Sequence, residues 1–177
     1  MTPTTPRCLI LACGNPLRGD DGVGPWLAEW AEERFRADEQ VRVVVRQQWT
    51  PELAEEIARA QSVLFIDCSV DSAPGSAALL PVEPTAAQGL ATHHLGAAEL
   101  LALSRDLYNS QPSNALLLTI GAGSTELGEA FSDAVTAALP AACRLIEEIV
   151  LRPLSGLRAG GVDTSISSAS HERNESA

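Results

Sequence analysis

Short apolar runs alternate with amphipathic segments along most of the chain. The apolar runs are typical of strands buried on both faces of a sheet, and they lie at 7–13, 41–46, 62–68 and 115–120. Segments with apolar residues at helical spacing lie at 22–36, 50–60, 96–108 and from 132 to about 151. Strand, helix and strand in this order predict right-handed crossovers between parallel strands.

One further strand is expected at 77–82, and its direction differs from the others. The linker 69–75 is too short for a crossover helix, and parallel strands need a connection of about a dozen residues or more. We therefore expect this strand to be antiparallel. The sequence predicts a single three-layer α/β domain over 1–153, with a mostly parallel twisted sheet of about five strands flanked by helices.

Helix signals and composition refine this outline. Ser132 is placed to cap the last helix, and Pro140 within it predicts a kink. Thr50 and Pro51 predict the N-cap and first position of the second helix. From 154 to 177 the chain is rich in Ser, Gly and charged residues without apolar periodicity, so we expect a disordered C-terminal tail.

Charge and cysteine content exclude several classes of function. With 12 basic and 23 acidic residues the net charge is -11, and no basic run favours nucleic-acid binding. No apolar stretch approaches the length of a membrane span and no secretory signal is recognisable, so we expect a cytoplasmic protein. The cysteines form no C-x-x-C pair and are interpreted as buried, reduced thiols that pack as small core residues: they are Cys8, Cys13, Cys68 and Cys143.

The most informative motif follows the first predicted strand. The segment 14–24 reads GNPLRGDDGVG, which places two adjacent acids in a glycine-flanked loop before a helix. Such loops form ligand sites in open α/β sheets. Asp20 and Asp21 stand where a phosphate-binding loop carries Lys and Ser or Thr, so the loop suits a cation better than a phosphate.

Three side chains form a candidate metal or catalytic constellation. Asp21 follows the first strand, Asp67 ends the third, and His93 lies in the loop before the helix at 96–108. In the common doubly wound order the first and third strands are neighbours, which brings the two aspartates to one crevice. Two carboxylates and an imidazole suit a divalent ion such as zinc, nickel or iron, with positions left open for substrate or water.

Each of these residues also has a plain structural interpretation. Asp20 or Asp21 can cap the following helix, and His93 or His94 can cap the next one or lie exposed. Cys68, beside Asp67, is a further candidate nucleophile, but a cysteine that ends an apolar strand more often packs in the core. No G-x-S-x-G elbow indicates a serine nucleophile.

Together these motifs resemble the [NiFe]-hydrogenase maturation endopeptidases. The resemblance rests on the signature G-N-x-x-x-x-D-[DE]-G-x-G at 14–24, on Asp67, on QWTPEL at 48–53, on Thr92-His93, and on TIG at 119–121. It spans the chain from about residue 8 to 150 in the right order. The opening signature is the specific part, and the other motifs support it.

The resemblance implies a function and a site. Enzymes of this family have an α/β fold and remove the C-terminal extension of a [NiFe]-hydrogenase large-subunit precursor. Carried over residue by residue, it makes Asp21, Asp67 and His93 the catalytic and metal-contacting residues, with His94 as the alternative histidine. The nickel is supplied by the precursor, and Asn15 and Asp20 are expected to orient the loop.

Two other functions fit the same motifs. One is a nickel-dependent checkpoint or chaperone that binds the loaded precursor without cutting it. The other is a small-molecule hydrolase with a resident metal. The resemblance favours the endopeptidase.

Overall fold

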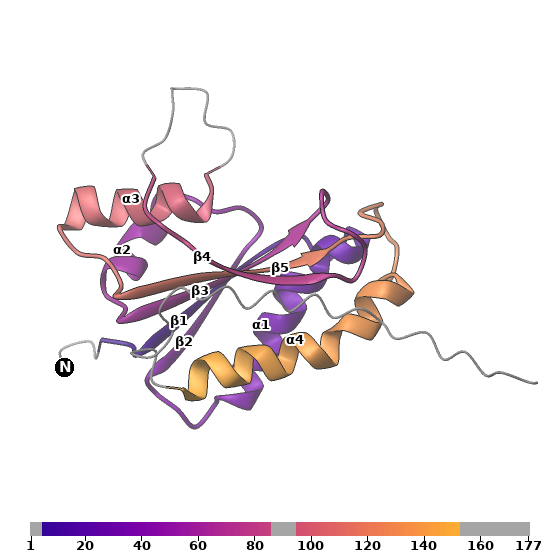
Figure 1. The fold of residues 1–177 in the computed structure, drawn as a ribbon, viewed down its shortest axis with the longest axis horizontal. Coiled ribbons are helices and arrows are strands. Elements are labelled where there is room, and N and C mark those ends of the chain that lie inside the picture. The colour runs from indigo at the N-terminus through magenta and orange to yellow at the C-terminus, as the bar shows by residue number, and fades with distance from the viewer. Residues whose placement is uncertain (1–4, 86–94, 153–177) are drawn as a thin grey trace, which may run out of the picture.

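In the computed structural model, residues 5–85 and 95–152 are described. Five strands in these parts of the chain form one sheet (Figure 1): β1 (Cys8–Cys13), β2 (Val41–Arg46), β3 (Ser62–Ser69), β4 (Ala77–Pro81) and β5 (Asn114–Gly121). Their order is β2-β1-β3-β5-β4. Neighbours are parallel except β4, which pairs antiparallel with β5. The predicted α/β class and the antiparallel strand are therefore confirmed.

Helices cover both faces of the sheet. The described helices are η1 (Gly19–Gly22, a 3-10 turn), α1 (Val23–Arg34), α2 (Leu53–Ala58), α3 (Ala97–Tyr108) and α4 (Asp133–Leu151). In Figure 1, α2 and α3 lie on one side of the sheet, and α1 and α4 lie on the other. Contacts between α2 and α3, and between α1 and α4, fit this three-layer arrangement.

Alternation along the strands divides the buried side chains into two cores. Ile10 of β1 and Leu64 of β3 point toward α1 and α4, whereas Leu11 and Phe65 point toward α2 and α3. Phe65, in the central strand, has no exposed surface. Because β1 and β3 are buried on both faces, they read as continuous apolar runs in the sequence.

The first two helices agree with the prediction to different degrees. The predicted helix at 22–36 is confirmed as α1 at Val23–Arg34, and it directly follows η1, in which Asp21 N–H bonds back to Arg18 in a tight turn. The predicted helix from Thr50 begins at Leu53, because the N–H groups of Leu53 and Ala54 reach only three residues back, to Thr50 and Pro51. Thr50 and Pro51 thus form a turn that leads into α2.

The last helix follows the predicted bounds closely. Ser132 caps α4 by accepting a hydrogen bond from Val135 N–H at 3.3 Å. The helix continues through Pro140, whose side chain is exposed and whose ring therefore displaces no core residue. None of the helices within 5–85 and 95–152 combines the length and apolar character needed to cross a bilayer.

Three calls made from the sequence fall outside the described residues. They concern His93, its alternative His94, and the tail at 154–177. They stay predictions.

Candidate functional site

The carboxyl ends of β1 and β3 lie side by side and carry the predicted acidic residues. The register pairs Ala12 of β1 with Ile66 of β3, so Cys13 and Asp67 stand one position beyond, at the same edge of the sheet. The loop after β1 leads into η1, which contains Asp21. Asp21 is close enough to Asp67 for its charge to raise the pKa of the Asp67 carboxyl. The two aspartates predicted from the sequence therefore lie near each other at this edge of the sheet.

Asp67 is held in a setting that favours its neutral form. Burial is the main cause, the N–H of Cys68 opposes it by donating to Oδ1 at 2.8 Å, and the negative charge of Asp21 adds to it. The net effect raises the pKa of Asp67 to about 6. By strand alternation its side chain lies on the same face as Phe65, toward α2 and α3. A carboxyl group with a pKa near 6 is suited to proton transfer near neutral pH.

Asp21 is held by the loop in which it lies. Its Oδ2 accepts a hydrogen bond from the N–H of Asn15 at 2.9 Å. The loop closes tightly at Gly14, where φ is 142° and an added Cβ would lie 2.0 Å from the carbonyl oxygen of Asp21. Only glycine fits such a conformation and such a close approach. The glycine that opens the sequence motif thus allows the loop to fold back onto Asp21.

Asp20, the residue before Asp21, has a fully buried side chain. Burial opposes its ionisation, but hydrogen bonds from the backbone N–H groups of Ser132, Ser124 and Gly123 and from the Ser132 hydroxyl outweigh it, so its pKa lies below the ordinary value. The adjacent acids therefore have different environments: Asp20 is buried and bonded to the loop before α4, whereas the charge of Asp21 acts on Asp67.

Two thiols flank the carboxylates, one on each face of the sheet. Burial, then the charges of Asp67 and Asp21, raise the pKa of Cys13 to about 12. Burial, then the charges of Asp21 and Asp67, raise the pKa of Cys68 to about 12 as well. Both thiols stay protonated at neutral pH, which argues against a cysteine nucleophile. The four cysteines of the chain are free.

Sequence reasoning missed that Cys13 belongs to the surroundings of the site. It was interpreted only as a core residue because it ends an apolar run. The available signal was its position: as the last residue of β1, Cys13 lies level with the end of the neighbouring strand β3. Its Sγ donates a weak hydrogen bond to the carbonyl of Gln47 at 3.4 Å, which ties the end of β1 to the loop after β2.

The third predicted ligand is not placed by the structure. His93 and His94 lie outside the described residues, and within 5–85 and 95–152 no group of three or more His, Cys, Asp and Glu side chains is arranged to hold a metal ion. Asp21 and Asp67 therefore offer oxygen donors of the kind a divalent ion accepts, and the set needs at least one further ligand.

The tryptophans serve mainly in packing. Trp30 stacks edge-on against Phe35 at 6.4 Å between ring centroids, and Trp49 against Phe65 at 5.4 Å. Trp26 is the more exposed one, at 38%. Trp49 lies in the loop after β2 and brings its ring to the face of the sheet that also bears Asp67.

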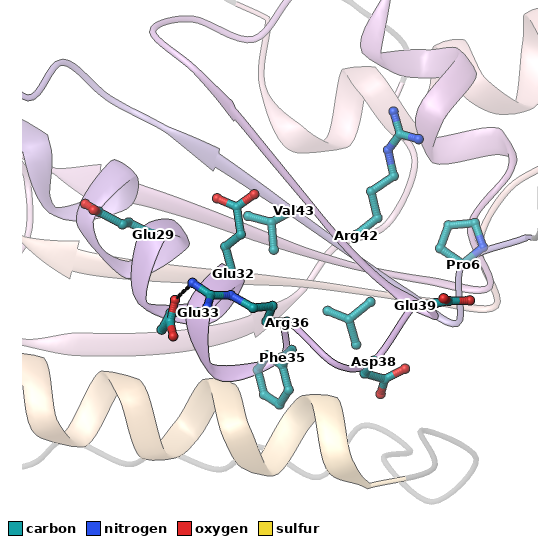
Figure 2. Close-up of a pocket in the computed structure, with 11 residues that line it drawn as sticks. Pro6, Glu29, Glu32, Glu33, Phe35, Arg36, Asp38, Glu39, Arg42 and Val43 are labelled. Carbon is teal, nitrogen blue, oxygen red and sulfur yellow. Dashed lines mark hydrogen bonds and ion pairs between the residues drawn. The ribbon is translucent and has the colours of Figure 1, made fainter.

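A groove lies elsewhere on the protein. It measures about 1010 Å³ and lies between the C-terminal half of α1 and the first residues of β2 (Figure 2). Val41 and Val43 of β2 line it together with acidic side chains from α1, including Glu29 and Glu32. Because Val41 pairs with Cys8 at the amino ends of the strands, this groove is at the opposite end of the sheet from Asp21 and Asp67.

Solved structures of other proteins share the fold of this chain. The chain is similar to the [NiFe]-hydrogenase maturation protease HycI of Thermococcus kodakarensis, at 25% identity and a TM-score of 0.63, over 82% of this chain and 93% of that one. It is also similar to the hydrogenase maturating endopeptidase HybD of Escherichia coli, at 21% identity and a TM-score of 0.66, over 81% and 91%. A hydrogenase 2 maturation peptidase from a Thaumarchaeota archaeon matches at 23% identity and a TM-score of 0.60, over 81% and 97%.

No family model matches the sequence, and no curated protein does so at a significant level. The three solved structures named above are nevertheless all hydrogenase maturation proteases. The fold of this chain is that of the hydrogenase maturation endopeptidases, and the resemblance seen in the sequence motifs is confirmed.

Proposed function

We propose that this protein is an endopeptidase that removes the C-terminal extension of a nickel-loaded [NiFe]-hydrogenase large-subunit precursor in a single cut. One observation carries the proposal: Asp21 and Asp67 meet at the carboxyl ends of β1 and β3 within the fold of maturation proteases. In open α/β sheets this edge is where ligands bind. The substrate is a folded protein, so recognition extends over the surface around the crevice.

In this proposal Asp21, Asp67 and His93 contact the nickel that the precursor brings. The nickel is part of the substrate, so the enzyme itself carries no permanent metal. Such an ion fixes the scissile region against the enzyme, polarises the peptide carbonyl or acidifies a water molecule. The two carboxylates match the oxygen part of the ligand set, and His93 supplies the nitrogen.

The protonation of the side chains supports hydrolysis by water rather than by a thiol. Cys13 and Cys68 are protonated at neutral pH because burial and neighbouring carboxylates raise the pKa of each to about 12. Asp67, with a pKa of about 6, can accept a proton from water at pH 7. We assign it the role of general base when it is not occupied by the metal.

We place the activity in the cytoplasm. The four cysteines of the chain are free, which suits a reducing compartment where thiols persist.

The proposal is tested by incubating the purified protein with the large-subunit precursor encoded beside it, before and after nickel insertion. Mass spectrometry of the precursor's C-terminus measures the cut. We expect cleavage only of the nickel-loaded precursor, and at least a 100-fold loss of rate in Asp21→Asn, Asp67→Asn and His93→Ala. The control is Asp71→Asn, which alters an exposed acid four residues after Asp67 and leaves the rate unchanged.

The two rival functions give different results in the same experiment. A checkpoint protein binds the loaded precursor but leaves its C-terminus intact. A small-molecule hydrolase binds zinc or nickel tightly without the precursor and does not cut it. The variant His94→Ala, run beside His93→Ala, identifies which of the adjacent histidines is needed.

A further inference from the structure

The side chain of Asp20 has no exposed surface and accepts four hydrogen bonds. Its Oδ2 accepts from the N–H of Gly123 at 2.6 Å, from the N–H of Ser124 at 3.0 Å and from the hydroxyl of Ser132 at 2.8 Å. Its Oδ1 accepts from the N–H of Ser132 at 2.7 Å. Every donor lies between the end of β5 and the start of α4.

These bonds join two parts of the chain that are more than 100 residues apart in sequence. They attach the η1 turn, which follows β1, to the loop 122–132. Backbone contacts extend the same junction: Asp20 N–H bonds to the carbonyl of Ser124 at 2.9 Å, and Gly128 N–H to that of Leu17 at 2.8 Å. The fit is close at Gly19, where an added Cβ would lie 2.8 Å from the Ser124 oxygen.

The junction sets the position of the neighbouring acid. Asp21 follows Asp20 in η1, and its own carboxylate is bound by the N–H of Asn15 on the other side of the turn. Asp20 therefore fixes the outer side of the turn to β5 and α4, and Asn15 fixes the inner side to the end of β1. Any loosening of Asp20 allows Asp21 to move relative to Asp67, which is carried by the rigid central strand.

We propose that Asp20 is a positioning residue for Asp21: by binding the loop 122–132 it holds the Asp21 carboxylate opposite Asp67. The role in cleavage rests on the endopeptidase function proposed above. A carboxylate is needed because both of its oxygens accept. An amide at this position offers one acceptor, and its NH₂ group faces an N–H donor, so the junction loses at least one bond.

The experiment compares Asp20→Asn with Ser62→Ala in the full-length protein. Ser62→Ala removes a buried hydrogen bond to the Arg7 carbonyl at the opposite end of β3, and so controls for general loss of stability. Two readouts are measured at temperatures equally far below each melting point: hydrogen exchange of the Asn15 amide by NMR, and kcat and KM for precursor cleavage.

We expect the Asn15 amide, whose acceptor is the Asp21 carboxylate, to exchange at least 10-fold faster in Asp20→Asn and less than 2-fold faster in Ser62→Ala. We also expect kcat to fall at least 10-fold in Asp20→Asn, with KM within 2-fold of the wild type, because the docking surface is retained while Asp21 is displaced. Asn15 exchange in Asp20→Asn equal to that in Ser62→Ala overturns the positioning role.

The exchange measurement does not depend on activity. If the wild type cuts no precursor while Asn15 exchange responds as expected, the proposed function fails and the positioning of Asp21 stands. If Asp20→Asn does not fold, Ser132→Ala replaces it, because that change removes one of the four donors, together with the N-cap of α4, and leaves the carboxylate in place. Asn15 exchange must then rise more than in Ser62→Ala, and equal rates overturn the proposal.

Discussion

Asp67 lies near the end of β3, and the fold holds its carboxyl group partly out of water. Burial raises its pKa to about 6, with a further contribution from the charge of Asp21. In the unfolded chain the same group has a pKa of about 3.9. Near neutral pH the native state must therefore keep an ionised group in a place that disfavours it, and folding becomes less favourable by that difference.

The first prediction concerns this stability. Asp67→Asn raises the free energy of unfolding of the metal-free protein at pH 7 by about 1–3 kcal/mol, since one pKa unit corresponds to about 1.4 kcal/mol. The amide oxygen can still accept the bond from the Cys68 N–H. Urea unfolding followed by circular dichroism measures the difference. Under the proposed function we expect the same substitution to abolish cleavage, so that activity and stability change in opposite directions.

The pH dependence of the gain has a definite sign. Between about pH 4 and pH 6 the native protein keeps a proton on Asp67 that the unfolded chain has released. The stability due to neutral Asp67 is therefore fully present below about pH 4 and is lost as the pH rises through 6. The advantage of Asp67→Asn must shrink toward pH 4. An advantage that is independent of pH, or equally large in the exposed variant Asp71→Asn, contradicts this account.

Part of the site could be predicted from the sequence, because some of its residues carry a signal in the residues directly beside them. Asp67 ends an apolar run and Asp21 lies in a glycine-flanked loop, so both could be recognised without knowing what surrounds them. The role of Asp20 was visible only in outline. Its partners are a hydroxyl and three backbone N–H groups in the loop 122–132, and backbone donors leave no mark in the amino-acid sequence.

At the scale of elements, the contact between β1 and α1 determines how close the first helix comes to the site. Gly24, the second residue of α1, packs directly on the end of β1. An added Cβ there would lie 2.2 Å from the carbonyl oxygen of Cys13. Backbone atoms on both sides make this contact, so no side-chain rotation can relieve an overlap.

The second prediction follows from this contact. Gly24→Ala forces α1 away from β1 and lowers the free energy of unfolding by about 1–3 kcal/mol, the usual cost of overpacking. The matched control is Gly96→Ala before α3, where an added Cβ would meet the end of the Glu99 side chain, which can rotate away at the cost of its bond from the Gly96 N–H. Thermal unfolding of both variants measures the difference. Equal losses in the two variants contradict the assignment of a rigid contact at Gly24.

Most elements could be predicted because their signals are local or follow from connection length. The antiparallel direction of β4 followed from the short linker before it. That β1 and β3 are adjacent in the sheet followed from the usual doubly wound strand order. The start of α2 could not be predicted in the same way. Thr50 and Pro51 are common both at a helix start and in a turn. The hydrogen bonds from the N–H groups of Leu53 and Ala54, which reach three residues back, show that they form a turn here.

At the scale of the whole molecule, acidic residues outnumber basic ones by 11. An excess of one sign of charge destabilises the compact state through repulsion, and salt screens that repulsion. Salt also weakens ion pairs such as Arg59–Glu55, but exposed pairs of this kind contribute little. Screening of the net charge should therefore dominate.

The third prediction is that the melting temperature rises by a few degrees when sodium chloride is increased from about 20 mM to about 300 mM at pH 7.5. Differential scanning calorimetry measures it. The same titration at pH 5, close to the isoelectric point of about 4.6, should give a much smaller rise because the net charge is nearly neutralised. A melting temperature that falls with salt at pH 7.5 would show that ion pairs outweigh the excess charge.

The junction between η1 and the loop 122–132 also has a consequence for biosynthesis. Asp20 and its partner Ser132 are separated by 112 positions. At translation rates of about 5–20 residues per second, the ribosome needs roughly 6–22 seconds to proceed from one to the other. During that interval the η1 turn has been synthesised, but the residues that donate hydrogen bonds to the Asp20 carboxylate have not all been made. A nascent or prematurely terminated chain therefore has both aspartates but lacks the junction that holds η1, and under the proposed function we expect the ability to cut to arise only after the loop 122–132 has been made.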